Sequence, residues 1–321
     1  MFFSLIIPIF NAAAYIEKCL ISCTTQDIAP DEYEIILIND GSTDKSFDII
    51  KRFAVEHKNI IIQNKANGGV SSARNAGLDI ANGKYIWFID ADDWIPEHVL
   101  KSVYSTLEDN NLDMLQFGYS VVATEKVQPC DSKLLVETSV RCPDSYIKSN
   151  LFIGGAGLTI FRSQIVKSNK IKFVQGLILA EDQLFMLEVL HHSSRVKRTD
   201  KILYNYYYNT LGASNNSKFN DLVFSIEKIS SFCYRERFKK YCDFLIIQQF
   251  ISACHQDNID LDRLNMVFRN ALINKNEFAI FKNPSVRHNI LARLCSIFGI
   301  SIVPYYIAIN KMTKILHLKS I

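Results

Sequence analysis

The first hundred residues alternate between short apolar runs of strand length and longer segments with helical spacing. The runs lie at 4–10, 34–38, 59–63 and 85–89, and the helical segments between them lie at 13–24, 44–57 and 70–81. Strands that are apolar along their whole length are buried on both faces by the helices that connect them. The pattern therefore predicts an α/β fold around a parallel sheet. Right-handed crossovers bring the carboxyl ends of such strands to one edge, where ligands bind.

Beyond residue 100 the alternation is less regular. A helix is predicted at 96–109, with Pro96 near its first turn, and the polar residues 124–142 indicate a loop. The other predicted elements are strands at 113–122, 158–161 and 201–208, and helices at 180–191 and from 218 to at least 272.

Composition narrows the class of protein. Hydrophobic residues make up 48% of the 321 residues, which is enough to bury a core and excludes intrinsic disorder. The 36 Lys and Arg nearly balance the 33 Asp and Glu, which argues against a nucleic-acid-binding protein. The eight cysteines include no Cys-x-x-Cys pair and are expected to be buried thiols in a reducing cytoplasm. The N-terminus lacks the features of a signal peptide, and no apolar run reaches the roughly 20 residues that span a bilayer.

Polar residues gather where each of the first four predicted strands ends. Asn11 follows the first strand, and the segments 39–44, 67–75 and 90–93 follow the other three. Because these strand ends share one edge of the sheet, we expect a single ligand site there.

The segment Asp90-Ala91-Asp92-Asp93 is the strongest part of this predicted site. Three carboxylates within four residues repel one another unless a cation compensates their charge. Carboxylate oxygens suit Mg²⁺ or Mn²⁺, whose coordination is completed by substrate phosphates and water. The alternative is an exposed acidic turn that caps the next helix, but the position directly after an apolar strand favours a metal site.

The other strand ends offer contacts for a nucleotide. Asp40 can accept hydrogen bonds from a nucleobase N–H or a ribose hydroxyl, and Gly41 permits a tight turn. The alternative for this segment is simple capping of the following helix. Gly68-Gly69 precedes a helix and could receive phosphate, while Arg74 on that helix could reach an anion. The chain has no Gly-x-Gly-x-x-Gly, which disfavours a dinucleotide site.

Glu181-Asp182 opens a predicted helix far downstream. Carboxylates at a helix N-terminus are favourable for dipole reasons alone, so a purely structural role is one interpretation. The functional interpretation is that one of the two acts as a general base.

Taken together, these motifs resemble the family-2 inverting glycosyltransferases, which have the nucleotide-sugar-binding GT-A fold. The resemblance extends over about residues 3–190. Its motifs are Ile-Ile-Pro-Ile-Phe-Asn at 6–11, Asn-Asp-Gly-Ser-Thr-Asp at 39–44, Asn-Gly-Gly at 67–69, Ala-Arg-Asn-Ala-Gly at 73–77, Asp-Ala-Asp-Asp at 90–93 and Glu-Asp at 181–182. The resemblance implies a Rossmann-like mixed sheet flanked by helices, with a helical C-terminal extension.

The resemblance also implies roles for individual residues. Asp40 would pair with the uracil of a UDP-sugar. Pro8 and Asn11 would line the nucleotide pocket, and Arg74 would lie near the nucleotide. Asn39 stands where many relatives have Asp, and its amide can still hydrogen-bond the base or ribose. Asp92 would face the Mn²⁺ or Mg²⁺ ion, Asp90 the ribose or the metal, and Glu181 and Asp182 would be the catalytic carboxylates, with Asp182 the base.

The implied reaction transfers a hexose (glucose, galactose or an N-acetylated form) from a UDP-sugar to a glycan hydroxyl with inversion, which gives a β-glycoside. A sugar nucleotidyltransferase is the first alternative, but its usual Gly-rich, Lys/Arg-containing triphosphate loop is missing from residues 10–14. A non-catalytic nucleotide-sugar-binding protein is the second, but it would tolerate the loss of Asp92 or Asp182, and both are present.

Charge is unevenly distributed along the chain. No Asp or Glu follows Glu277, and six Lys or Arg follow it, so the tail carries +6 and residues 1–277 carry −3. We therefore expect a GT-A catalytic domain at 1–215 and a helical region at 216–321 with a basic tail. The apolar segment 296–309 is too short to span a bilayer and could lie at an anionic membrane surface or pack on the catalytic domain. The corresponding hypothesis is a cytoplasmic enzyme at the inner face of a bacterial inner membrane. It would act on a lipid-linked glycan acceptor in lipopolysaccharide, O-antigen or capsule synthesis.

Overall fold

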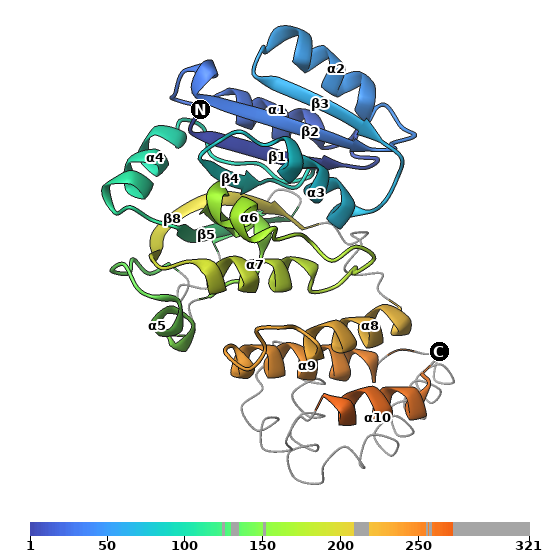
Figure 1. The fold of residues 1–321 in the computed structure, drawn as a ribbon. Helices are drawn as coiled ribbons and strands as arrows, with labels where there is room; N and C mark the ends of the chain where they lie inside the picture. The colour runs from blue at the N-terminus through green and yellow to red at the C-terminus, as the bar shows by residue number, and fades with distance from the viewer. Residues whose placement is uncertain are drawn as a thin grey trace. The chain divides into compact units, whose positions relative to one another are not determined.

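The computed structural model describes residues 1–123, 126–129, 135–149, 152–208, 218–254, 256 and 259–271. Within these residues, eight strands form one mixed sheet (Figure 1). The strands are β1 (Phe3–Ile9), β2 (Tyr33–Asp40), β3 (Ile60–Lys65), β4 (Tyr85–Phe88), β5 (Met114–Ala123), β6 (Lys126–Pro129), β7 (Thr159–Arg162) and β8 (Val196–Tyr207). The helices are α1 (Ile16–Thr24), α2 (Ser46–Glu56), α3 (Val70–Ile80), α4 (Leu100–Asp109), α5 (Pro143–Lys148), α6 (Ser163–Asn169), α7 (Glu181–His192), α8 (Phe219–Ser230), α9 (Lys239–Ala253) and α10 (Leu261–Asn270).

The first four strands form the parallel half of the sheet. The strand order is β3-β2-β1-β4-β7-β5-β6, with β8 paired to β5, and β1 to β4 all run parallel. β7 is antiparallel to both β4 and β5, while β8 is parallel to β5. The α/β class and the parallel arrangement predicted for the first hundred residues are confirmed.

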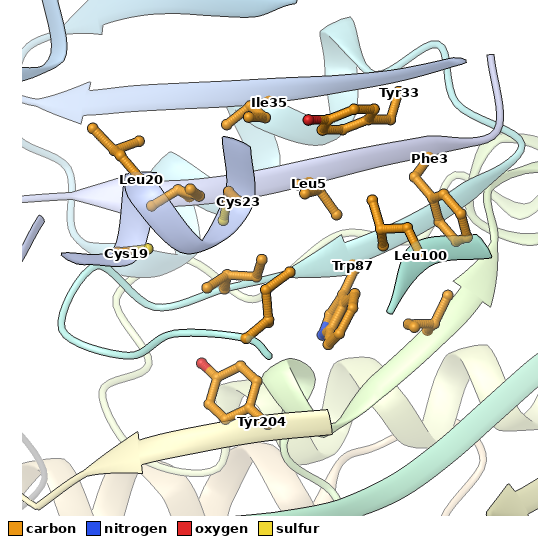
Figure 2. Packing of buried hydrophobic residues seen from close by; sticks show 14 of the residues in the cluster. Phe3, Leu5, Cys19, Leu20, Cys23, Tyr33, Ile35, Trp87, Leu100 and Tyr204 are labelled. Carbon is orange, nitrogen blue, oxygen red and sulfur yellow. The ribbon is translucent and has the colours of Figure 1, made fainter. Parts of the chain in front are cut away.

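Helices cover both faces of the parallel half. On one face, side chains of α1, α2 and α4 form a core with alternate residues of β1, β2 and β4. Figure 2 shows part of it, with Cys19, Leu20 and Cys23 of α1 beside Leu5 and Trp87. On the other face α3 packs against β1 and β2, and a Cβ atom at Gly77 would lie only 2.3 Å from Cγ2 of Ile6. A glycine at 77 therefore lets α3 approach the sheet closely.

Three predicted elements differ from the structure. The helix predicted at 96–109 begins only at Leu100, because residues 96–99 form a turn in which His98 has a φ of 55°. Gln26 Oε1 accepts the N–H groups of Val99 and Leu100 at 3.1 and 3.3 Å, and so satisfies the helix start from a different segment. The polar stretch 124–142 contains β6, which pairs with β5 as a hairpin. β8 begins at Val196, five residues before the predicted strand.

The chain divides into two compact units. The first contains Met1–Gly176 and Glu181–Thr210, and the second contains Leu177–Ala180 together with the described residues from 218 onward. In the second unit, α8, α9 and α10 pack against one another, and the buried carboxylate of Asp243 pairs with Arg235 and Lys239. The predicted boundary at 215/216 stays a prediction, because residues 209–217 lie outside the described residues, as does the basic tail. Among the described helices, none has the length and apolar character needed to cross a membrane.

Candidate active site

The sheet brings the polar strand ends to one edge. β2, β1 and β4 are adjacent and parallel, so Asp40, Asn11 and Asp90 all lie at or just after the carboxyl ends of neighbouring strands. Pro8 lies buried within β1 opposite Ile38 of β2, and β4 pairs with β1 only as far as Ile6. The missing N–H of a proline is therefore tolerated at this end of the strand.

Asp40 at the end of β2 holds the loop that precedes α3. Its Oδ1 accepts hydrogen bonds from Lys65 Nζ at 2.5 Å and from the Gly68 N–H at 3.0 Å, and its Oδ2 accepts the Gly69 N–H at 2.8 Å. Gly69 has a φ of 82°, and a Cβ on it would meet nothing within 4 Å. The carboxylate of Asp40 is thus buried and partnered, and the open space beside Gly69 allows a ligand to approach the backbone.

Asn11 and Asn39 shape the neighbouring turns. Asn11, with a φ of 50°, accepts the N–H of Thr43 at 2.8 Å, and its own N–H donates to Ser42 Oγ at 3.1 Å. Asn39 is buried, donates to Asn64 Oδ1 at 3.0 Å and accepts the Ser42 N–H at 3.3 Å. Asn11 therefore joins the turn after β1 to the turn after β2, and the Asn39–Asn64 pair joins the ends of β2 and β3.

The carboxylates that follow β4 have different surroundings. Asp90 accepts a hydrogen bond from Arg74 and keeps 38% of its side chain exposed. Asp92 accepts no hydrogen bond from another residue among those the structure describes. Burial and the negative charge of Asp90 raise the pKa of Asp92 to about 6. A second positive charge near Asp92 would relieve this penalty.

Asp93 is buried and holds the loop in place through β8. Its Oδ1 accepts the Tyr207 N–H at 2.7 Å, and its carboxylate also accepts the Tyr204 hydroxyl. The Tyr204 oxygen in turn accepts the Asp90 N–H at 3.0 Å. Burial and the charge of Asp90 raise the pKa of Asp93 to about 8. One residue further on, Trp94 exchanges both backbone hydrogen bonds with Asn205. Sequence reasoning assigned no role to Tyr204, although the Tyr-rich composition of its strand was visible.

Arg74 joins the loop after β4 to the start of α7. It is 5% exposed, and its two terminal nitrogens donate to Asp90 at 2.9 Å and to Glu181 Oε1 at 3.2 Å. Its guanidinium also lies over the ring of Phe173, 5.3 Å from the centroid. Burial opposes the charge of Arg74, but Asp90 and Glu181 outweigh burial and raise the pKa of Arg74. Residues 74, 90 and 181 are thereby brought into one ion-pair network.

The next residue, Asn75, fixes the segment that leads to α7. Its side chain donates to the Phe173 carbonyl at 2.9 Å and accepts the Phe173 N–H at 2.8 Å. The Phe173 ring stacks on Phe185 of α7 at 3.9 Å. The Arg74-Asn75 pair therefore connects α3 with both the carboxylates and the aromatic cluster beneath them.

Glu181 and Asp182 form the first turn of α7. Burial and the charge of Asp182 raise the pKa of Glu181 to about 7, although Arg74 opposes the shift. Burial also raises the pKa of Asp182, against the lowering effect of Arg74. The carboxylate of Asp182 accepts the N–H of Gln183 at 2.8 Å. Within the described part of the chain Arg74 pairs with Glu181 and not with Asp182, which leaves Asp182 as the carboxylate of the two that can take up a proton.

A divalent cation fits the donor set around Asp92. Within the described residues, no group of three or more His, Cys, Asp or Glu side chains is arranged to hold a metal alone. Asp92 and the remaining oxygen of Asp90 offer hard ligands without competing hydrogen bonds. Such a pair suits a cation whose other ligands are phosphates and water.

Residues 4–134 match the family model described as glycosyl transferase family 2. The chain belongs to this family. It is 30% identical over 211 residues to the uncharacterized glycosyltransferase EpsJ of Bacillus subtilis, and this alignment covers 64% of this chain and 61% of EpsJ. It is 30% identical over 224 residues to the poly(ribitol-phosphate) beta-N-acetylglucosaminyltransferase TarP of Staphylococcus aureus, and this alignment covers 68% of this chain and 66% of TarP. The alignments thus span less than two thirds of either relative.

A solved structure supports the fold assignment. The structure of Staphylococcus aureus TarS residues 1–349 in complex with UDP-GlcNAc aligns with a TM-score of 0.71 at 21% identity, and covers 94% of this chain and 90% of that one. This member of the family therefore has the GT-A fold, with a mixed sheet flanked by helices.

The structure brings the sequence-predicted residues together in two groups linked by α3. Asn11, Asn39 and Asp40 surround the turns after β1 and β2. Arg74, Asp90 and Glu181 share direct ion pairs, with Asp92 and Asp182 beside them in the sequence. Asp40 holds the backbone at the start of α3, and Arg74 extends from its second turn. Pro8 contributes to the β1 backbone, without a polar contact to either group.

Proposed function

We propose that this protein is an inverting hexosyltransferase that moves a sugar from a UDP-sugar donor to a hydroxyl of a glycan acceptor. The observation that carries the proposal is the Arg74 network. The guanidinium of Arg74 pairs with both Asp90 and Glu181. Asp90 lies two residues before Asp92, the candidate metal ligand, and Glu181 directly precedes Asp182, the candidate base. A site for the leaving group and a site for the base thereby lie on either side of one side chain.

The nucleotide half of the site would use the residues at the ends of β1 and β2. The Asp40 carboxylate accepts four hydrogen bonds, from Lys65 Nζ and from the N–H groups of Gly68 and Gly69, and a uracil N–H would take the place of one of these donors. Asn11 and Asn39 keep the turns beside it in place, and the ribose would lie against Asp90. Arg74, which is buried, would influence the nucleotide through Asp90.

Asp182 would act as the general base. It would take the proton of the acceptor hydroxyl while the oxygen of that hydroxyl attacks the anomeric carbon from the face opposite the diphosphate. The bond from the anomeric carbon to the diphosphate breaks, and UDP leaves with the electron pair. A single displacement inverts the configuration, so an α-linked donor gives a β-glycoside. The raised pKa of Asp182 and Glu181 makes the pair a better proton acceptor than an exposed carboxylate.

Asp92, with Asp90, would hold Mn²⁺ or Mg²⁺. When bound, the cation supplies positive charge that stabilises the diphosphate leaving group. Asp93, Tyr204 and Tyr207 would keep the loop that carries these carboxylates in its position.

The relatives indicate the class of donor and acceptor. The UDP-GlcNAc complex of TarS supports a UDP-sugar, and the name of TarP, a poly(ribitol-phosphate) beta-N-acetylglucosaminyltransferase, supports a polymeric acceptor and a β-linkage. We propose a donor among UDP-glucose, UDP-galactose and their N-acetylated forms, and an acceptor in a bacterial surface polysaccharide such as lipopolysaccharide, O-antigen or capsule. Cys19, Cys23, Cys142, Cys233 and Cys242 are free thiols, which fits a reducing cytoplasm, and the basic tail would attach the enzyme to the inner membrane face.

The test is a panel of UDP-sugars incubated with the protein and Mn²⁺ or Mg²⁺, with release of UDP measured by mass spectrometry. We expect one donor to be consumed and consumption to stop when a chelator removes the metal. Failure to release UDP from every donor would contradict the proposed function. Asp92→Asn is the matched variant, and its loss of metal-dependent UDP release would support the metal assignment.

A further inference from the structure

One face of β8 carries three tyrosines in a row beside the candidate site. Tyr204 and Tyr206 are two residues apart in the strand, and Tyr208 follows directly after it. Alternate residues of a strand point to the same face, so the three rings share one face. The register is regular here, with Tyr204 opposite Tyr119 and Tyr206 opposite Val121 of β5, and Tyr208 donates its N–H to the Val122 carbonyl.

The row is anchored at its buried end. Tyr204 is 2% exposed and holds both Asp90 and Asp93 through its hydroxyl. A Cβ on Gly157 would lie 2.9 Å from this hydroxyl, so a glycine there leaves room for the ring. On the opposite face of the strand, Tyr207 is fixed by its N–H bond to Asp93 and by its ring contact with Tyr15 at 5.3 Å.

The other two rings of the row are exposed. Tyr206 is 39% exposed and Tyr208 is 49% exposed. The residues on either side of Tyr206 along the strand bind the carboxylate loop, because Tyr207 donates its N–H to Asp93 and Asn205 pairs with Trp94. Burial and the charges of Asp93, Asp92 and Asp90 raise the pKa of the Tyr206 phenol, so its hydroxyl stays protonated. Exposed aromatic rings with a neutral hydroxyl suit the apolar face of a sugar ring and its hydroxyl groups.

The strand order tells which substrate the row would meet. The candidate nucleotide residues follow β1 and β2, on one side of β4, while β8 pairs with β5 on the other side (Figure 1). The loop after β4 crosses toward β8, where Trp94 pairs with Asn205. A ligand group bound at Tyr206 would therefore lie on the opposite side of the carboxylate loop from the nucleotide.

We propose that Tyr206 and Tyr208 form a subsite for a sugar ring of the glycan acceptor, positioned by Tyr204. This inference rests on the proposed function, since it assigns the acceptor side of the same site. The rings of Tyr206 and Tyr208 stack on the acceptor, and the acceptor hydroxyl is thereby presented beside Asp92 and the base.

The test separates donor use from acceptor use. UDP release from the UDP-sugar in the absence of acceptor reports the donor site alone. Transfer is then measured with p-nitrophenyl β-glucoside, β-galactoside and β-N-acetylglucosaminide as acceptor probes, and saturation-transfer NMR detects their binding directly. Tyr206→Ala and Tyr208→Ala should each raise the acceptor KM by about tenfold, a loss typical of one aromatic contact, with donor KM unchanged. Tyr206→Phe should retain most of the acceptor affinity because it keeps the ring.

Ile61→Ala provides the matched control, because Ile61 is a strand residue with the same exposed fraction of 39% on the edge strand β3. We expect wild-type kinetics from it. An unchanged acceptor KM in both alanine variants, an equal rise in donor KM, or no saturation transfer to any glycoside would overturn the inference. Absence of UDP release by the wild-type protein would instead refute the proposed function, and the inference with it.

Discussion

Arg74 is the residue on which the candidate site depends most, because it pairs with two carboxylates, Asp90 and Glu181, that lie far apart in the sequence. Its guanidinium is buried and its Nε has no hydrogen-bond partner among the described residues. Removing one partner of a buried ion pair leaves the other charge without compensation. The residue was predicted from its motif to lie near the nucleotide, and the structure shows it in direct contact with Asp90 and Glu181.

We expect Arg74→Gln to move the acidic limb of the pH–rate profile to higher pH. Burial and Asp182 raise the pKa of Glu181 to about 7, and the positive charge of Arg74 holds it from rising further. Without that charge the carboxylate pair binds its proton more tightly. Since the base must be ionised to accept a proton, transfer then requires a higher pH.

The measurement is kcat/KM for transfer over a range from about pH 5.5 to about pH 9. Arg52→Gln is the matched control, because Arg52 pairs with Glu17 at 2.5 Å on an exposed surface. Its profile should coincide with that of the wild type. An Arg74→Gln profile with an unshifted acidic limb would show that Arg74 does not act through these carboxylates.

At the scale of elements, α3 and β8 organise the site from two sides. α3 begins at a loop held by Asp40, carries Arg74 and Asn75, and packs closely on β1 through Gly77. β8 holds the loop after β4 through Tyr204 and Tyr207. The two elements thus fix the carboxylate loop before any ligand binds, which reduces the ordering that binding must accomplish.

Tyr204→Phe tests the contribution of β8. The variant keeps the buried ring but removes the donor to Asp93 and the acceptor of the Asp90 N–H, so it should cost about 1–3 kcal/mol of the free energy of unfolding. It should also weaken Mn²⁺ binding in the presence of UDP by about tenfold or more, as is common when the support of a metal ligand is lost. Denaturant unfolding and Mn²⁺ titration give the two quantities.

Tyr85→Phe is the control for this variant. Tyr85 is also a buried ring, and its hydroxyl donates to Glu108 at 2.7 Å, away from the carboxylate loop. It should lose some stability and keep Mn²⁺ affinity. Equal Mn²⁺ affinities in the wild type, Tyr204→Phe and Tyr85→Phe would show that the Tyr204 hydroxyl does not support the metal site.

The sequence was most informative about the parallel half of the sheet. The runs around Leu5, Ile36 and Trp87 are apolar on both faces, so the strands, their parallel arrangement and the shared edge of the sheet could be predicted from the apolar pattern. β8 was harder to predict, because Lys197 and Arg198 are the second and third residues of the strand, and the burial of Arg198 depends on contacts such as that with the Phe117 carbonyl.

Contacts between distant segments were beyond local patterns. Asp93 and Tyr204 are 111 positions apart, and nothing in the neighbourhood of either residue indicates the other. The partners of Arg74 likewise became visible only when α3 and α7 were placed on the same face of the sheet. The acidic cluster was recognised from its spacing, whereas the different environments of Asp90, Asp92 and Asp93 follow from tertiary packing.

At the scale of the whole molecule, the carboxylates of the site lower the free energy of unfolding as pH rises. Burial raises the pKa of Asp92 to about 6, of Glu181 to about 7 and of Asp93 to about 8, above the ordinary values of such groups. The folded protein therefore binds protons more tightly than the unfolded chain. The contribution of these groups to the free energy of unfolding falls as pH increases from about 4 to about 8.

Denaturant unfolding in chelator at about pH 5.5 and about pH 8 measures this effect. Asp93→Asn should flatten the difference, because the amide oxygen still accepts the Tyr207 N–H while the titrating group is gone. Glu56→Gln, on the exposed end of α2, serves as the control and should leave the pH dependence unchanged. A wild-type protein and an Asp93→Asn variant with the same pH dependence would contradict this account.

The most direct test of the central claim compares sugar transfer and UDP binding in the wild type and in Asp182→Asn. The amide keeps the acceptor for the Gln183 N–H but cannot take up the proton of the acceptor hydroxyl. We predict that transfer falls by about 10²–10⁴-fold while the affinity for UDP with Mn²⁺ is unchanged. Glu188→Gln on the same helix should transfer at the wild-type rate. Retained transfer with weakened UDP binding would contradict the assignment of Asp182 as the base.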